Sequence, residues 1–240
     1  MTLCLQNLHI DYPGLDGAVK ELTLEISPSE FLVLCGPPGC GKTAVIRMIA
    51  GLDTPSAGDI LYNGKSMVSV PVKDRNFFLF SSAHTFHMRG GTLYQNLARG
   101  LRLRKAAKED IDAAVRAAAQ RLNLTEFLQT KLKRLDPLAR AKAFLARMLL
   151  RPVSVVLLDE PLKGLAESLH ESLMDCLVDL WRQLQVPFLY ATIDTKQAAY
   201  LNQRIAVLRQ GKLKQVGTIE ELRTSPIDIF VEKFMQEVIE

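Results

Sequence analysis

The stretch FLVLCGPPGCGKTAVIRMIAGL, residues 31–52, constrains the fold more than any other part of this 240-residue chain. It reads as a buried strand, a glycine-rich loop and a helix. Gly36, Gly41, Lys42 and Thr43 have the G-x-x-x-x-G-K-[ST] spacing of a phosphate-binding loop. Small loop residues let backbone N–H groups surround a phosphate, and the helix N-terminus adds a positive end. A chance match has odds of about 1% in average composition, so a plain glycine turn is disfavoured.

Each residue type in this loop has an expected role. Lys42 is expected to neutralise the β- and γ-phosphate oxygens, and the Thr43 hydroxyl is expected to bind Mg²⁺. The predicted nucleotide-binding residues of the loop are Gly36, Pro37, Pro38, Gly39, Cys40, Gly41, Lys42, Thr43 and Ala44.

A second motif, VSVVLLDEP at 153–161, is an apolar strand that ends in two carboxylates. Asp159 is expected to hold Mg²⁺, directly or through water, and Glu160 is the candidate base that orients and deprotonates an attacking water. The alternative is a buried strand ending in a capping acid. The phosphate-binding loop elsewhere in the chain argues against that reading.

The apolar pattern predicts an α/β core interrupted by helices. No convincing strand is expected between 92 and 150, where AKEDIDAAVRAAAQRL (107–122) reads as an amphipathic helix. The tail is expected to form a final helix with Ile227, Phe230, Phe234 and Val238 on one face. Strands are predicted at 3–10, 19–26, 31–35, 58–62, 77–80, 154–158, 187–191 and 204–208, with a last strand at LKQVG (213–217).

Composition and charge exclude several classes of protein. The net charge of +4 comes from scattered basic residues, so no nucleic-acid surface is expected. No apolar run reaches the ~18 residues of a membrane span, and the N-terminus does not read as a signal peptide. We therefore expect a soluble protein made in the cytosol. The four cysteines lack metal-ligand or disulfide spacing, and Cys4 and Cys35 are expected to be core thiols.

With these two motifs, the chain resembles the ATP-binding subunits of ABC transporters, most closely the sugar and polyamine importers. The resemblance extends over nearly the whole length and includes GLDTPSAGDILYNGK (51–65), VKDRNFFLF (72–80), FLARMLLRPVSVVLLDEPL (144–162) and RIAVLRQGKLKQVGTIEEL (204–222). It implies a RecA-like core (1–81 and 152–240) with an antiparallel β subdomain and an inserted helical subdomain (82–151). It also implies ATP and Mg²⁺ as cofactors, with Tyr12 stacked on adenine. The C-terminal barrel of longer importer ATPases is expected to be missing.

The same resemblance implies partners. Two ATPase subunits would sandwich two ATP molecules, and transmembrane permease subunits would hold the chain at the cytoplasmic side of the inner membrane. The permease contact is expected at 83–94, with Phe86 and Met88 as apolar contacts. His84 and His87 are read as surface or contact residues rather than metal ligands. Whether the pair is a homodimer or a heterodimer stays open.

Four motifs depart from the family pattern. The LSGGQ signature falls on Leu135–Ala139, where Asp136 is a favoured N-cap and Pro137 suits the first helical position. The acid places a negative charge at the helix end, the proline removes an N–H donor, and Leu138 is bulky where a backbone must approach closely. The other replacements are Ser81 for the glutamine of the Q-loop, Lys163–Ala166 for the SxLD of the D-loop, and Ile193 for the switch histidine.

These departures predict a chain that binds Mg·ATP but hydrolyses it poorly as a homodimer. One well-placed donor to a developing charge is worth about 10²–10³ in rate, although losses within a cooperating set do not simply multiply. A complete partner subunit is expected to supply the missing signature. The alternatives are a pseudo-ATPase that uses ATP occupancy for regulation, an unrelated phosphate-loop kinase, and a decaying duplicate without a present role.

Overall fold

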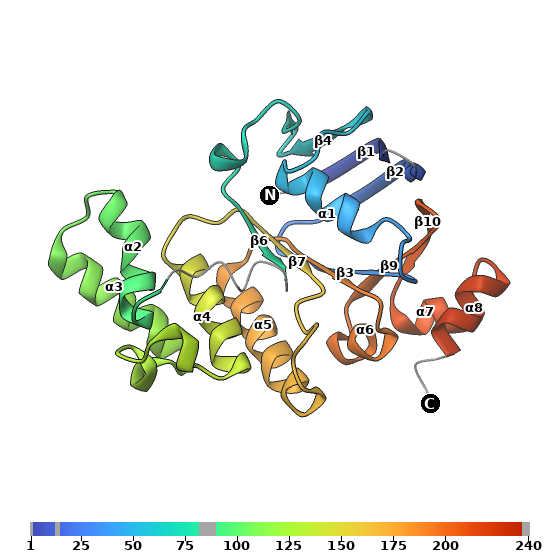
Figure 1. The fold of residues 1–240 in the computed structure, drawn as a ribbon. Helices are drawn as coiled ribbons and strands as arrows, with labels where there is room; N and C mark the ends of the chain where they lie inside the picture. Colours follow the sequence, from blue (N-terminus) through green and yellow to red (C-terminus); the bar gives the residue numbers. More distant parts are fainter. Residues whose placement is uncertain (1, 13–14, 82–89, 237–240) are drawn as a thin grey trace. The chain divides into compact units, whose positions relative to one another are not determined.

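The structure, a computed structural model, describes residues 2–12, 15–81 and 90–236. Its residues divide into two compact units, and Figure 1 shows the course of the chain through their helices and strands. The first consists of Met1–Leu79, Ser154–Glu160 and Leu180–Glu240, and the second of Phe80–Val153 and Pro161–Asp179.

A six-stranded sheet, with the order β10-β9-β3-β8-β7-β6, is the framework of the nucleotide motifs. The strands β9, β3, β8 and β7 run parallel, and β10 pairs antiparallel with β9. The central strands are buried apolar runs, as expected when both faces of a parallel sheet are covered. The bounds are β3 Phe31–Cys35, β6 Phe77–Ser81, β7 Val155–Asp159, β8 Phe188–Thr192, β9 Arg204–Arg209 and β10 Lys212–Gly217.

The first unit also contains an antiparallel sheet, ordered β2-β1-β4-β5, which forms one apolar core with helix α1 (Lys42–Ala50). Val45, Ile46 and Ile49 of the helix are fully buried in this core. The buried apolar residues of α1 therefore hold this helix, which follows the glycine-rich loop, against the antiparallel sheet. The sheet strands are β1 Leu3–Tyr12, β2 Leu15–Ile26, β4 Ala57–Tyr62 and β5 Lys65–Ser66, and the remaining helices of this unit are α6 Thr195–Leu201, α7 Ile219–Thr224 and α8 Ile229–Gln236.

The second unit is helical, and its described residues contain one isolated β-bridge, Thr92 to Lys131, besides the end of β6. The predicted start of α4 is confirmed: Asp136 Oδ1 accepts a hydrogen bond from the Ala139 N–H at 2.8 Å, and Pro137 is the first helical residue. A cap of this kind contributes about 1 kcal/mol to helix stability. The helices are α2 Leu93–Leu103, α3 Lys108–Arg121, α4 Pro137–Leu149 and α5 His170–Leu184, the last of which continues into the first unit.

The α/β fold class is confirmed, and the predicted strands lie within a few residues of their observed bounds. Two side-chain expectations were wrong. The tail helix begins at Ile229, so Ile227 precedes it and is exposed, while Val231, Phe234 and Met235 form the buried face. Val238 lies outside the described residues. Cys35 is buried, but Cys4 is only half-buried because it lies on the less covered side of β1.

Across the part of the chain that the structure describes, every helix is too short or too polar to span a lipid bilayer.

Candidate functional site

The glycine-rich loop connects the buried strand β3 to the N-terminus of α1. Gly41, the N-cap, has φ 109°, and a Cβ there would lie 2.4 Å from the Ala18 carbonyl oxygen. At Gly36, which adopts no such φ, a Cβ would lie 2.3 Å from the Leu208 carbonyl oxygen. Both positions therefore require glycine, one for its backbone angle and both for the lack of a side chain. The missing side chains let the loop pass close to the backbone of Ala18 and Leu208.

Lys42 is buried at the start of α1, with 5% of its surface exposed. Its ammonium group donates to the carbonyl oxygens of Gly36 at 2.8 Å and Pro37 at 3.1 Å. The loop thus wraps around the charge of its own lysine. A buried ammonium group needs such partners, and phosphate oxygens can replace these two carbonyls as acceptors.

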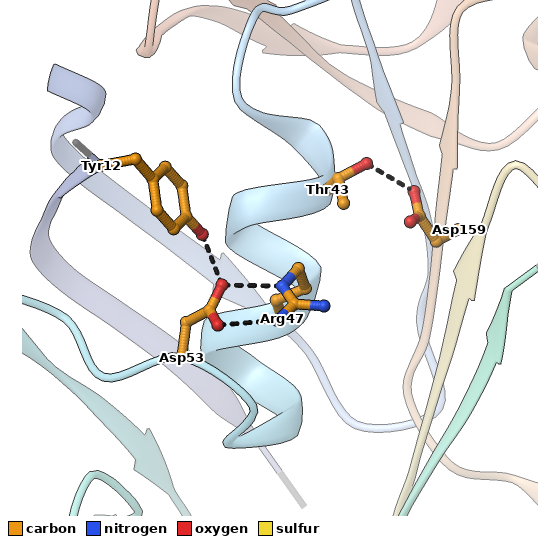
Figure 2. Close-up of polar contacts among 5 residues, drawn as sticks. All are labelled: Tyr12, Thr43, Arg47, Asp53 and Asp159. Carbon is orange, nitrogen blue, oxygen red and sulfur yellow. Dashed lines mark hydrogen bonds and ion pairs between the residues drawn. The ribbon is translucent and has the colours of Figure 1, made fainter. Parts of the chain in front are cut away.

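Thr43 and Asp159 come from different elements and meet at the carboxyl end of the parallel sheet. The Thr43 hydroxyl donates to Asp159 Oδ1 at 3.1 Å (Figure 2). A hydroxyl and a carboxylate oxygen at this separation fit Mg²⁺, which takes one or two protein oxygens and fills its octahedron with phosphate and water. Glu160 follows with φ 47°, and its N–H donates to the Ala191 carbonyl at 3.0 Å. This bond links the candidate base to strand β8.

Tyr12 lies at the end of β1, where it belongs to a charged cluster that the sequence did not reveal. Arg47 of α1 forms two hydrogen bonds with Asp53, at 2.7 and 2.8 Å, and the Tyr12 hydroxyl donates to the same carboxylate (Figure 2). The hydrogen bonds from Arg47 lower the pKa of Asp53. Burial, followed by the bond to Asp53, raises the pKa of Tyr12 to about 12. The tyrosine side chain is therefore anchored through its hydroxyl.

The replacement Asp53→Asn tests this cluster. It keeps the shape of the side chain but removes the charge facing Arg47, which is itself partly exposed, so we expect a loss of about 1 kcal/mol in unfolding free energy at pH 7. Because the pKa of Asp53 is lower in the folded chain than in the unfolded chain, the stabilisation is fully present above the unfolded pKa of about 3.9. It weakens as the pH falls through the pKa of the folded chain. Urea unfolding at pH 7 and pH 3, with the exposed Glu126→Gln as control, measures the difference. A loss of equal size at both pH values would contradict the ion pair.

A hollow of about 600 Å³ lies beside the phosphate-binding loop in the first unit. Pro37 and Pro38 of the loop line it together with Ile193, Arg209 and four residues of α8, which are Ile229, Phe230, Lys233 and Phe234. The sequence predicted a tail helix but gave no signal that it lies next to the loop. Phe230 and Phe234 stack with ring centroids 5.5 Å apart, which confirms that these two share a face.

Ile193 occupies the predicted switch position and is 47% exposed. The residues around it are held by a buried polar network in which the Gln197 side-chain oxygen accepts hydrogen bonds from Tyr190 at 2.7 Å and Thr192 at 2.9 Å. Asp194 caps α6 through the Lys196 N–H at 2.8 Å. The backbone is thus fixed on both sides of a side chain that has no hydrogen-bonding atom.

In the second unit, the N-terminus of α4 is occupied by its own cap. The Asp136 carboxylate accepts a hydrogen bond from the Ala139 N–H, and Pro137 has no N–H donor. A negative side chain already interacts with the positive helix end. The loss of an anion site at 135–139 stays a prediction.

The other altered motifs have ordinary local structures. Ser81 ends β6 and is buried. In the segment Lys163–Ala166, Gly164 has φ 84°, and the Leu165 N–H donates to the Leu162 carbonyl at 3.0 Å. The expected permease contacts His84, Phe86, His87 and Met88 lie outside the described residues.

Residues 19–163 match the family described as "ABC transporter". This chain belongs to the ABC transporter family. The match includes both nucleotide motifs, so the phosphate-binding loop and the Asp159–Glu160 pair lie in an ABC ATP-binding domain. Because the chain belongs to this family, the alternative of an unrelated phosphate-loop kinase is excluded.

Its relatives in the ABC family include import ATP-binding proteins. The chain is 40% identical over 227 residues to the trehalose/maltose import ATP-binding protein MalK of Thermococcus litoralis, with 91% of this chain and 60% of the relative aligned. It is 35% identical over 222 residues to the spermidine/putrescine import ATP-binding protein PotA of Vibrio cholerae, with 92% and 58% aligned. The chain therefore spans about three fifths of the length of these relatives.

A solved structure confirms the RecA-like fold of an ABC ATPase. CbiO1 from Clostridium perfringens, described as part of the ABC transporter complex CbiONQ, matches with a TM-score of 0.84 and 22% identity. The alignment covers 98% of this chain and 92% of that one.

Proposed function

We propose that this chain is the ATP-binding subunit of an ABC importer, which binds Mg·ATP and hydrolyses it weakly when alone. The observation that carries the proposal is the meeting of Thr43 and Asp159 beside the buried Lys42. The import function of the relatives supports the direction of transport. The transported substrate is expected to be selected by other subunits.

In this proposal, Lys42 exchanges its two loop carbonyls for β- and γ-phosphate oxygens, and the loop N–H groups surround the β-phosphate. Tyr12 stacks on adenine, with its hydroxyl anchored by Asp53. Thr43 and Asp159 hold Mg²⁺, which neutralises phosphate charge. Glu160 orients the attacking water and takes its proton. The other loop residues named above shape the backbone around the phosphates.

The weak turnover follows from the four altered motifs. Ile193 offers no proton donor to the γ-phosphate, and the hydroxyl of Ser81 has a shorter reach than a glutamine amide. Asp136 and Pro137 leave the α4 N-terminus unable to bind a facing nucleotide, and Lys163–Ala166 lacks the aspartate of the D-loop. A second ATPase chain with complete motifs would restore one site of a heterodimer.

The proposed assembly is a peripheral one. Permease subunits hold the chain at the cytoplasmic face of the inner membrane, and no nucleic acid takes part. The core 1–81 and 152–240 binds nucleotide, and the helical subdomain 82–151 takes part in contacts with the permease.

Calorimetric titration with ATP and a phosphate-release assay on the purified chain test the proposal together. We expect micromolar ATP binding that requires the loop, and turnover far below that of a complete ABC ATPase. A chain that does not bind ATP contradicts the proposed function. Binding without detectable turnover, alone or with any second ATPase chain, favours the pseudo-ATPase alternative.

A further inference from the structure

The hollow of about 600 Å³ beside the phosphate-binding loop has the size and the lining of a small-molecule site. Six of the eight residues that line it are proline, isoleucine or phenylalanine. The other two are Arg209 and Lys233, so none of the described residues that line the hollow is acidic. Apolar walls combined with charge of one sign favour a ligand that is itself apolar over most of its surface and negatively charged at one end.

The wall of the hollow that α8 forms is held in place from its other side. Asp228, just before the helix, accepts a hydrogen bond from the Val231 N–H at 2.9 Å and pairs with Lys214 of β10 at 3.1 Å. The side chain of Gln215 in the same strand accepts a hydrogen bond from the Ile227 N–H at 2.8 Å. Because these contacts already order the wall, a ligand loses less free energy in binding against it.

Arg209, at the end of β9, brings hydrogen-bond donors to the hollow. The central carbon of its guanidinium group lies 4.3 Å from the centroid of the Phe230 ring. Stacking of this kind uses a face of the guanidinium group and leaves the N–H donors at its edge. Within the described part of the chain, these donors form no hydrogen bond or ion pair. An arginine edge binds a carboxylate through two parallel hydrogen bonds.

The carboxylates next to these walls in the sequence are engaged elsewhere. Asp194 caps α6 and accepts a hydrogen bond from the Gln197 amide at 3.0 Å. Asp228 forms the ion pair with β10. The positive charge that Arg209 and Lys233 bring to the hollow is therefore available to an anion from outside the chain.

We propose that this hollow binds a small organic anion with a flat apolar body, of the aryl carboxylate class. The carboxylate lies on the edge of Arg209, and the aromatic body covers Ile193 and Ile229, which are 47% and 69% exposed. Removing these apolar side chains from water favours binding. A bare phosphate would use the two cations but leave the apolar walls in water. This site goes beyond the ATP-binding function proposed above and would stand without it.

Calorimetric titration of the full chain with naphthoate tests the proposal, and naphthamide, a neutral molecule of nearly the same shape, is the matched control. We expect naphthoate to bind at least about tenfold more tightly than naphthamide, because charge-assisted hydrogen bonds are stronger than neutral ones. The difference between the two affinities is expected to shrink at high salt.

Variants locate the bound naphthoate. Arg209→Gln is expected to weaken its binding by at least about tenfold. Arg223→Gln, at an exposed arginine of α7 in the same unit, and Lys42→Ala in the phosphate-binding loop are expected to leave it unchanged. Because Arg209 also stacks on Phe230, circular dichroism checks the fold of this variant. Ile229→Ser changes an exposed side chain outside the core, and it is expected to weaken naphthoate binding several-fold.

Equal binding of naphthoate and naphthamide, or no binding of naphthoate up to about 1 mM, would overturn the proposal. So would equal effects of Arg209→Gln and Arg223→Gln. Binding that Lys42→Ala abolishes and Arg209→Gln does not would place the anion in the phosphate-binding loop and would also overturn it. A chain that forms a dimer in ultracentrifugation, loses the dimer with Ile229→Ser and does not bind naphthoate would show that a second copy covers the hollow instead.

ATP binding is measured on the same samples, so that the two proposals are tested separately. Absence of ATP binding in the unmodified chain refutes the proposed function. Failed naphthoate binding with ATP binding intact refutes only this inference.

Discussion

Ile193→His combined with Asp136→Ser, Pro137→Gly, Leu138→Gly and Ala139→Gln is expected to raise ATP turnover by about 10²-fold or more. The histidine supplies a donor to the γ-phosphate. The replaced helix start removes a carboxylate and restores N–H groups that point at a facing nucleotide. Serine is also a good N-cap, so α4 keeps its start.

Phosphate release at saturating ATP measures this gain. The matched control adds Glu160→Gln to the same replacements, which should remove most of the gain because the base is lost. The Ile193→His change and the replacement of residues 136–139 are expected to act together, because effects within a cooperating set of residues are not additive. If the combined variant hydrolyses no faster than the original chain, the altered motifs do not limit turnover and the account of weak hydrolysis is wrong.

Lys42→Ala is expected to weaken ATP binding by at least about tenfold, since charge-assisted hydrogen bonds contribute about 1.5–3 kcal/mol each. In the structure this ammonium group is buried and held within the loop by two loop carbonyls. Calorimetric titration with ATP measures the change, and Lys133→Ala, at an exposed lysine of the second unit, is the control. Unchanged ATP affinity in Lys42→Ala would place the nucleotide elsewhere on the chain.

The sequence predicted well those features that depend on neighbouring residues. The phosphate-binding loop, its strand and helix, and the Asp136 cap of α4 are determined within about ten residues, because glycine, proline and capping residues act locally. The carboxyl end of β7 was also predicted from the sequence, because an apolar run that ends in two acidic residues has few interpretations other than a buried strand.

Features that depend on tertiary contacts were not predicted. Arg47 meets Asp53 because Gly51, with φ 79°, caps the end of α1, and the Leu52 N–H donates back to the Arg47 carbonyl at 2.9 Å. That glycine was the available signal, but the third partner, Tyr12, comes from a distant strand. The buried face of α8 was misplaced by the same lack of information, since the position of the helix start decides which residues face inward.

In the proposed function, the chain binds its own ATP, but the N-terminus of α4 cannot bind the ATP of a second copy. Analytical ultracentrifugation of the Glu160→Gln variant with ATP tests it directly, because hydrolysis cannot then release a closed pair. We expect a monomer with bound ATP, and an ATP-dependent dimer once Asp136→Ser, Pro137→Gly, Leu138→Gly and Ala139→Gln are added. An ATP-dependent dimer with the native residues 136–139, of the same affinity as the replaced form, would contradict it.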